Sequence, residues 1–178
     1  MSPNETFALT HPDDRNVMTR RPLSDADRRI LSTLQSQGRI SNVDLAEQVA
    51  MSQSPCLRRV KALEADGVIT GYGAKLDRKT LNLGLEAFVQ VKIERHTDED
   101  AQAFRDAVSR RPEVVGCYAM TGDMDFLLRI LAPDLEAFGQ FAMQTLLKMP
   151  GVRETKSAFV IETIKDDTDL PLDFVVKE

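Results

Sequence analysis

From residue 85 onward the sequence repeats one pattern, strand then helix then strand, and this repeat limits the folds open to the chain. In both copies a proline closely follows the predicted helix, Pro112 in the first and Pro150 in the second. A residue that precedes proline is disfavoured in helical conformation, so each helix must stop there and the chain must continue in extended form. Two successive βαβ units make a βαββαβ domain of ferredoxin type.

Hydrophobic periodicity sets the expected bounds of these elements. Alternating apolar residues predict strands, and apolar residues three or four positions apart predict helices. The first unit is expected as strand 85–93, helix 99–110 and strand 114–121, and the second as strand 126–131, helix 135–148 and strand 152–164. The inward faces of the two helices are expected to carry Ala103, Phe104, Ala107 and Val108, and Phe138, Phe141, Ala142, Thr145 and Leu146.

Three shorter helices are predicted before this domain, and residues typical of helix caps begin and end them. The helices begin after Ser24, after Ser41 and after Ser52 or Ser54. A serine in this position accepts a hydrogen bond from a free backbone N–H of the first turn. Gly38 and Gly67 end the first and third helices, since glycine tolerates the left-handed conformation that often follows a helix. Residues 68–74, β-branched and interrupted by glycine, predict the short strands of a wing.

The third helix has separate apolar and basic faces. At 100° per residue, one side carries Cys56, Leu57, Val60 and Leu63, the opposite side carries Ser54, Arg58 and Lys61, and Arg59 lies on the flank. A basic face that starts at the N-terminus of a helix, after a tight turn, suits entry into the major groove of DNA. Ser54 and Arg58 would then face base edges, and Arg59 and Lys61 would contact phosphates. The pattern alone also fits a small helical bundle whose charges are merely solvated.

The charge of the chain is unevenly distributed around its net value of −5. Residues 19–75 hold nine Lys or Arg against six Asp or Glu, whereas residues 76–178 hold thirteen against nineteen. The positive surplus therefore belongs to the three-helix segment, as expected for a domain that binds nucleic acid. A surplus of this size is informative only because part of it lies on one helix face.

The turn Thr121-Gly122-Asp123-Met124-Asp125 joins the two central strands of the predicted sheet. Asp and Gly favour such turns for purely structural reasons, because Asp side chains bond their own backbone. Alternatively, Asp125 and the backbone beside Gly122 recognise the ammonium and carboxylate groups of a small zwitterion. The hydroxyls of Thr155 and Ser157 on the last strand project from one face, which is also ordinary for a strand.

Nothing in the sequence supports an enzyme. It has no nucleophile with a matching base, no phosphate-binding loop and no paired-cysteine metal signature, so neither a cofactor nor a metal is expected. His11 and His96 are expected at the surface, and Cys56 and Cys117 as reduced, mostly buried thiols. The absence of a membrane-length apolar run and of a secretory signal leads us to expect a cytoplasmic protein.

Several phrases of the sequence together resemble the Lrp/AsnC (leucine-responsive/asparagine regulator) family. In the first half they are LSDADRRIL at 23–31, GRISN at 38–42, SPCLRRV at 54–60 and GVITGY at 67–72. In the second half they are TGDMDFLL at 121–128 and LKMPGV at 147–152, in the order and spacing of the family's effector domain. The resemblance extends from about residue 23 to residue 172, and so many linked phrases are not expected by chance.

The resemblance implies an α+β protein, a winged helix-turn-helix joined to a βαββαβ domain, which forms homodimers that assemble further, often to octamers. It implies binding of double-stranded DNA at promoters and control of genes for amino-acid metabolism or transport in response to an amino-acid effector. The expected division of the chain is a disordered tail 1–21, a DNA-binding domain 22–75, a linker 76–84, an effector and oligomerisation domain 85–165 and a C-terminal tail 166–178.

The resemblance also implies which residues form the sites. The DNA-binding element falls on residues 42–61, where the candidates are Asn42, Ser52, Gln53, Ser54, Arg58, Arg59 and Lys61. The effector pocket falls on Gly122, Asp123, Met124, Asp125, Thr155, Ser157, Ala158 and Phe159, with neighbours across a dimer interface. The tail before Leu23 is longer than is common in the family, and some relatives carry a large side chain where this chain has Ala158, which leaves the effector's identity open.

Two other functions fit parts of the sequence. Oligomers of such subunits would condense DNA through phosphate contacts without any ligand, as architectural proteins do. Alternatively, the C-terminal domain would sense an amino acid in order to regulate an enzyme, which leaves the basic helix unexplained.

Overall fold

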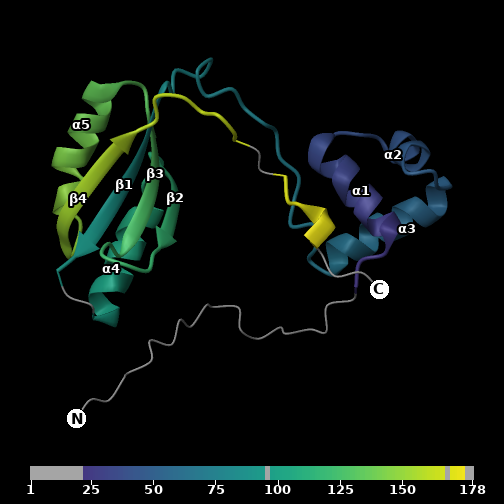
Figure 1. The fold of residues 1–178 in the computed structure, drawn as a ribbon, viewed down its shortest axis with the longest axis horizontal. Coiled ribbons are helices and arrows are strands. Elements are labelled where there is room, and N and C mark those ends of the chain that lie inside the picture. Colours follow the sequence, from purple (N-terminus) through teal and green to yellow (C-terminus); the bar gives the residue numbers. More distant parts are fainter. Residues whose placement is uncertain (1–21, 95–96, 167–168, 175–178) are drawn as a thin grey trace, which may run out of the picture. The chain divides into compact units, whose positions relative to one another are not determined.

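The structure, a computed structural model, describes residues 22–94, 97–166 and 169–174, and the tail expected at 1–21 lies outside them. The chain divides into two compact units, which are described separately. The helical unit comprises the described residues up to Ala74 together with 169–174, and the sheet unit comprises those from Lys75 to Asp166. Figure 1 shows both units.

The helical unit contains the three predicted helices, α1 (Asp25–Ser36), α2 (Asn42–Gln48) and α3 (Gln53–Ala65). The Ser41 hydroxyl accepts a hydrogen bond from the backbone N–H of Asp44, as predicted for a cap. The first residue before α3 is Ser52, but its side chain makes no capping bond. The helices enclose one apolar core of Ile30, Leu31, Leu45, Ala46, Val49, Cys56, Val60 and Leu63.

The wing predicted at residues 68–74 does not form as strands. The segment follows α3 after Gly67, whose φ of +69° turns the chain away from the helix axis. The Tyr72 hydroxyl donates to Glu64 Oε1 at 2.9 Å and thereby holds the segment against the end of α3. A strand needs a hydrogen-bonded partner strand, and no described residue pairs with this segment.

The C-terminal segment belongs to the helical unit and is not a simple tail. The backbone N–H of Leu170 donates to Gln35 Oε1 at 2.6 Å, and the Gln35 amide donates back to the Leu170 carbonyl at 3.3 Å. Leu172, at the start of the short 3₁₀ helix η2 (Leu172–Phe174), packs against the helical core. The chain therefore contributes to its first unit from both ends of the described sequence.

The sheet unit has the predicted βαββαβ order. Its elements are β1 (Leu85–Ile93), α4 (Asp98–Ser109), β2 (Val114–Ala119), β3 (Phe126–Ala132), α5 (Leu135–Gln144), the 3₁₀ helix η1 (Leu146–Lys148) and β4 (Val152–Phe159). The strands form one antiparallel sheet in the order β2-β3-β1-β4. Helices α4 and α5 pack on one face of it (Figure 1), where Phe104 and Phe138 meet the alternate buried side chains of β1 and β3.

Several predicted bounds in this unit were off by one or two residues, for example the end of β2 at Ala119 instead of Thr121, and two were wrong by more. The last strand ends at Phe159, which pairs with Ala87 of β1, five residues before the predicted Ile164. The second long helix is interrupted at Thr145 and finishes as η1. A tightened last turn is common where a helix must end, and here the following Met149 precedes a proline.

A buried carboxylate anchors both chain connections of the sheet unit. Glu86 of β1 is 5% exposed, and its Oε1 lies 2.6 Å from Arg129 Nε while its Oε2 lies 2.9 Å from Arg78 Nη2. Arg129 also lies 3.5 Å from Asp166 through Nη2. Arg78 and Asp166 stand near the two points where the chain enters and leaves the unit, so one network fixes both to the sheet.

Glu86→Gln is expected to lower the free energy of unfolding by about 1–3 kcal/mol, because it removes the charge that two guanidinium groups share at a buried position. The partial exposure of both arginines keeps the loss below that of a fully buried pair. Urea unfolding measures the change, with the exposed Glu162→Gln as control. Equal stability of the Glu86 variant and the wild type would contradict the anchoring role.

Candidate functional site

The outward face of α3 carries the polar residues that the sequence predicted. Ser54, Arg58 and Lys61 are exposed and lie four and three residues apart, hence on one side of the helix. Ser52 and Gln53, at its N-terminus, are also exposed, and so is Asn42 at the start of α2. The opposite face is buried at Cys56, Val60 and Leu63, while Leu57 is only half-buried. The predicted phase of the helix is thereby confirmed.

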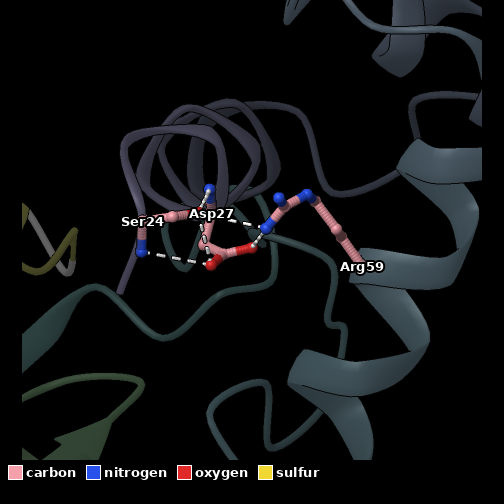
Figure 2. Close-up of polar contacts among 3 residues, drawn as sticks. All are labelled: Ser24, Asp27 and Arg59. Atoms are coloured by element: carbon pink, nitrogen blue, oxygen red, sulfur yellow. Dashed lines mark hydrogen bonds and ion pairs between the residues drawn. The ribbon is translucent and has the colours of Figure 1, made fainter. Parts of the chain in front are cut away.

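Arg59 has a partner inside the helical unit. Figure 2 shows its side chain reaching from α3 to Ser24 and Asp27 at the start of α1. Arg59 Nη1 lies 2.9 Å from Asp27 Oδ1 and donates to Ser24 Oγ at 3.1 Å. The sequence predicted Arg59 as a phosphate contact and gave no sign of this partner, because Asp27 is 32 positions away.

Asp27 is the second buried acidic side chain of the described residues, 1% exposed. Burial alone would raise its pKa, but the hydrogen bonds from Ser24 and Arg59 outweigh burial and hold the pKa below its usual value. The carboxylate is thus ionised at neutral pH. Burial raises the pKa of the Cys56 thiol, so this core cysteine stays protonated.

The turn between β2 and β3 is bound to β1 through Asp125. The Asp125 carboxylate accepts a hydrogen bond from the Ile93 backbone N–H at 2.8 Å, and the Asp125 N–H donates to the Val91 carbonyl at 2.9 Å. Gly122 has a φ of +111°, which side-chain-bearing residues rarely adopt. Asp125 therefore supports the turn as a structural residue, one of the two roles that the sequence left open for it.

A hollow of about 300 Å³ lies beside this turn on the sheet unit. It is lined by Gln90, Met120, Thr121, Asp123, Met124, Phe126, Leu127 and Lys156. Of the predicted effector residues, Asp123 and Met124 line the hollow, while Gly122 and Asp125 belong to the same turn without lining it. The hollow combines a carboxylate and an ammonium group with thioether and aliphatic walls.

Strand register separates the predicted β4 residues into two groups. Ala158 is paired with Phe88, and Lys156 with Gln90, so these side chains share the face that carries the hollow. Thr155 is paired with the buried Val91, and Ser157 with the buried Val89, which places both hydroxyls on the helix-covered face.

The ring of Phe159 lies 5.1 Å from that of Phe138 in α5, so Phe159 also faces the helices. Thr155, Ser157 and Phe159 thus point away from the hollow of their own chain.

Six residues that line the hollow were not among the predicted effector residues: Gln90, Met120, Thr121, Phe126, Leu127 and Lys156. Thr121 and Phe126 adjoin predicted residues of the turn, and Lys156 lies between two predicted strand hydroxyls, so position in the sequence was a usable signal for these three. The prediction that both cysteines are mostly buried was wrong for Cys117, which is exposed on the edge strand β2. Within the described ranges, every helix is too short or too polar to cross a membrane.

Comparison with known proteins supports both units. Residues 23–70 match a family model described as winged helix-turn-helix DNA-binding, and residues 86–170 match the Lrp/AsnC ligand binding domain. Leucine-responsive regulatory proteins from Klebsiella pneumoniae and Escherichia coli are 39% identical to this chain over 148 residues, which cover 83% of this chain and 90% of each relative.

Solved structures give the same result. A transcriptional regulator from Neisseria meningitidis, in complex with L-methionine, is 44% identical with a TM-score of 0.82 and covers 85% of this chain and 97% of its own. An AsnC family transcriptional regulator from Agrobacterium tumefaciens is 39% identical with a TM-score of 0.82 and covers 86% of this chain and all of its own. The two domains expected from the sequence are therefore present in the expected order.

Gly122→Ala is expected to lower the free energy of unfolding by about 1–3 kcal/mol through backbone strain alone. An added Cβ would meet no atom within 4 Å, so the cost comes from the φ of +111°. Gly139→Ala in α5 is the matched control, since its Cβ is equally free of contacts. Because alanine favours helix, the free energy of unfolding of the control variant should rise by about 0.5–1 kcal/mol, as measured by thermal unfolding. A neutral Gly122→Ala would mean that the turn adopts another conformation.

Proposed function

Because this chain belongs to the Lrp/AsnC family of transcriptional regulators, we propose that it controls transcription by binding promoter DNA through α3 and by responding to an amino acid bound at the sheet unit. The observation that carries the proposal is the division of α3 into a buried apolar face and an exposed face with Arg58 and Lys61. A helix that served only to complete a bundle would need no such stripe. Members of this family regulate transcription and are not enzymes.

On DNA, the N-terminal half of α3 would enter the major groove. Ser54 and Arg58 would face base edges, and Lys61 would contact a phosphate, because these side chains share the exposed face. Asn42, Ser52 and Gln53 stand at the starts of α2 and α3, where backbone N–H groups favour phosphate oxygens. This set differs from the one expected from the sequence only in Arg59.

The proposed effector is an amino acid with an apolar or thioether side chain. Met120, Met124 and Leu127 offer apolar contacts, and Asp123 offers a carboxylate for the ammonium group. Lys156 would hold the effector's carboxylate, since its own contact with Glu154 is a 3.4 Å surface pair in which the lysine is 63% exposed. Such pairs contribute little and exchange readily. The L-methionine complex of the Neisseria meningitidis regulator agrees with this class of ligand.

We further propose homodimers that assemble to octamers in the cytoplasm, where promoter DNA is found. Exposed apolar side chains on the strand and loop surface support association, among them Val115, Tyr118 and Met120. In such an assembly a neighbouring chain would cover the hollow. Residues of that chain would make the contacts with the effector that were predicted for Thr155, Ser157, Ala158 and Phe159. The genes controlled would be those of amino-acid metabolism or transport.

Arg58→Ala should reduce the preference for specific over scrambled promoter DNA, because loss of a base contact costs about 1–3 kcal/mol. Gel-shift titrations of both DNAs at one salt concentration measure it. The control is Arg29→Ala, an exposed arginine of α1 outside the predicted element. An equal loss on both DNAs would leave Arg58 as a phosphate contact only. A wild-type protein with no preference at all would favour the architectural function instead.

Asp123→Ala should weaken binding of the amino acid about tenfold or more while DNA binding without effector stays intact, because a carboxylate–ammonium pair is lost. A thermal-shift screen of the twenty amino acids identifies the effector, and calorimetry then gives its affinity. Asp98→Ala, an exposed carboxylate of α4, is the control. Undiminished affinity of the Asp123 variant would place the effector elsewhere. Asp125→Ala, by contrast, should also disturb the turn itself.

A further inference from the structure

Arg59 of α3 points toward α1 and contacts the Asp27 carboxylate, which Ser24 already holds in place. Asp27 Oδ2 accepts hydrogen bonds from the Ser24 hydroxyl at 2.6 Å and from the Ser24 backbone N–H at 3.2 Å. Asp27 Oδ1, the other oxygen, lies 2.9 Å from Arg59 Nη1. The capping box of α1 therefore fixes the orientation of the carboxylate, and the position of Oδ1 in turn sets where the Arg59 guanidinium lies (Figure 2).

We propose that Arg59 is a positioning residue, which pairs with Asp27 to fix the rotation of α3 about its own axis and thereby sets the side chains of α3 that face DNA. This inference rests on the function proposed above for α3. Apolar packing between α1 and α3 is non-directional and tolerates small rotations. A hydrogen-bonded ion pair is directional, so it restricts them.

The position of Arg59 in the helix explains how its pair with Asp27 can set the direction of Arg58. Arg59 directly follows Arg58, and neighbouring residues of a helix are 100° apart around its axis. With Arg59 held toward α1, Arg58 is directed to the exposed face that it shares with Ser54. Any rotation that released Arg59 would carry Arg58 away from the base edges by the same angle.

The same contacts argue against Arg59 as a phosphate contact. The Arg59 side chain is 35% exposed, whereas Asp27 is 1% exposed. Movement of the guanidinium to a phosphate would leave the buried carboxylate without it, which is costly inside a protein. A phosphate contact at the surface is screened by water and salt, so it contributes less free energy than the loss of the buried ion pair costs. Arg59 should therefore remain with Asp27 when DNA is bound.

The test uses four variants: Asp27→Asn, Arg59→Gln, the double variant that combines these two, and, for comparison, Arg58→Gln. DNA selected by the wild type from a random-sequence pool and a scrambled control are titrated over a range of salt concentrations. Binding is measured at a temperature where circular dichroism shows each variant folded. If Arg59→Gln does not fold, Arg59→Lys replaces it, since lysine keeps the charge with a single contact, and a smaller loss of affinity is expected. Asp27 is decisive because a buried side chain cannot touch DNA.

We expect Asp27→Asn and Arg59→Gln each to weaken binding to selected DNA about tenfold, the equivalent of one charge-assisted hydrogen bond. Scrambled DNA should be affected little, the double variant should be no worse than either single one, and the slope of log affinity against log salt should stay unchanged.

Three results would overturn the inference. A slope lowered by about 1 in Arg59→Gln, with unaltered binding by Asp27→Asn, would make Arg59 a phosphate contact. Lower melting temperatures with unaltered DNA binding would leave the pair a stabilising contact only. If the wild type selects no sequence from the pool, the proposed function fails, and the inference fails with it; if the wild type selects DNA, the inference is judged alone.

Discussion

The double pairing of β1 is the constraint on which the sheet unit depends. β1 is hydrogen-bonded to β3 along one edge and to β4 along the other, and both registers are antiparallel. Because strand side chains alternate between faces, these registers decide every grouping in the unit. They bring Gln90, Leu127 and Lys156 together at the hollow. They also place Asp125 where it can bind the end of β1, which holds the turn beside that hollow.

Buried charge follows one rule in both units. The two buried acidic residues of the described chain, Asp27 and Glu86, are each paired with arginine. A carboxylate in a low-dielectric interior is tolerated only when it is paired and hydrogen-bonded, so each of these residues dictates where its partner must lie. Asp27 orients Arg59 of α3, and Glu86 holds the segments through which the chain enters and leaves the sheet unit. Apolar packing forms the two cores, and these directional ion pairs fix the orientation of the segments that carry the arginines.

The two proposed sites belong to different units of one chain. A ligand alters DNA binding only if its affinity differs between two states of the protein, so an effector bound at the sheet unit would have to favour one of these states over the other. The helical unit is also built from both ends of the described chain, since Leu170 and Leu172 contact it after β4. The chain therefore connects the two units at two points, before β1 and after β4.

The sequence by itself determined the local structure and the family. The capping serines Ser24 and Ser41, the buried face of α3 and all nine residues of β1 follow from short-range spacing, which adjacent residues encode. Only the tertiary structure decided the partner of Arg59, the side of β4 on which Thr155 lies and the end of β4 at Phe159. Each depends on residues distant in sequence: a carboxylate on another helix, or the register of a partner strand. The strands predicted for the wing at 68–74 are absent for a related reason: residues with β propensity form a strand only when another strand pairs with them.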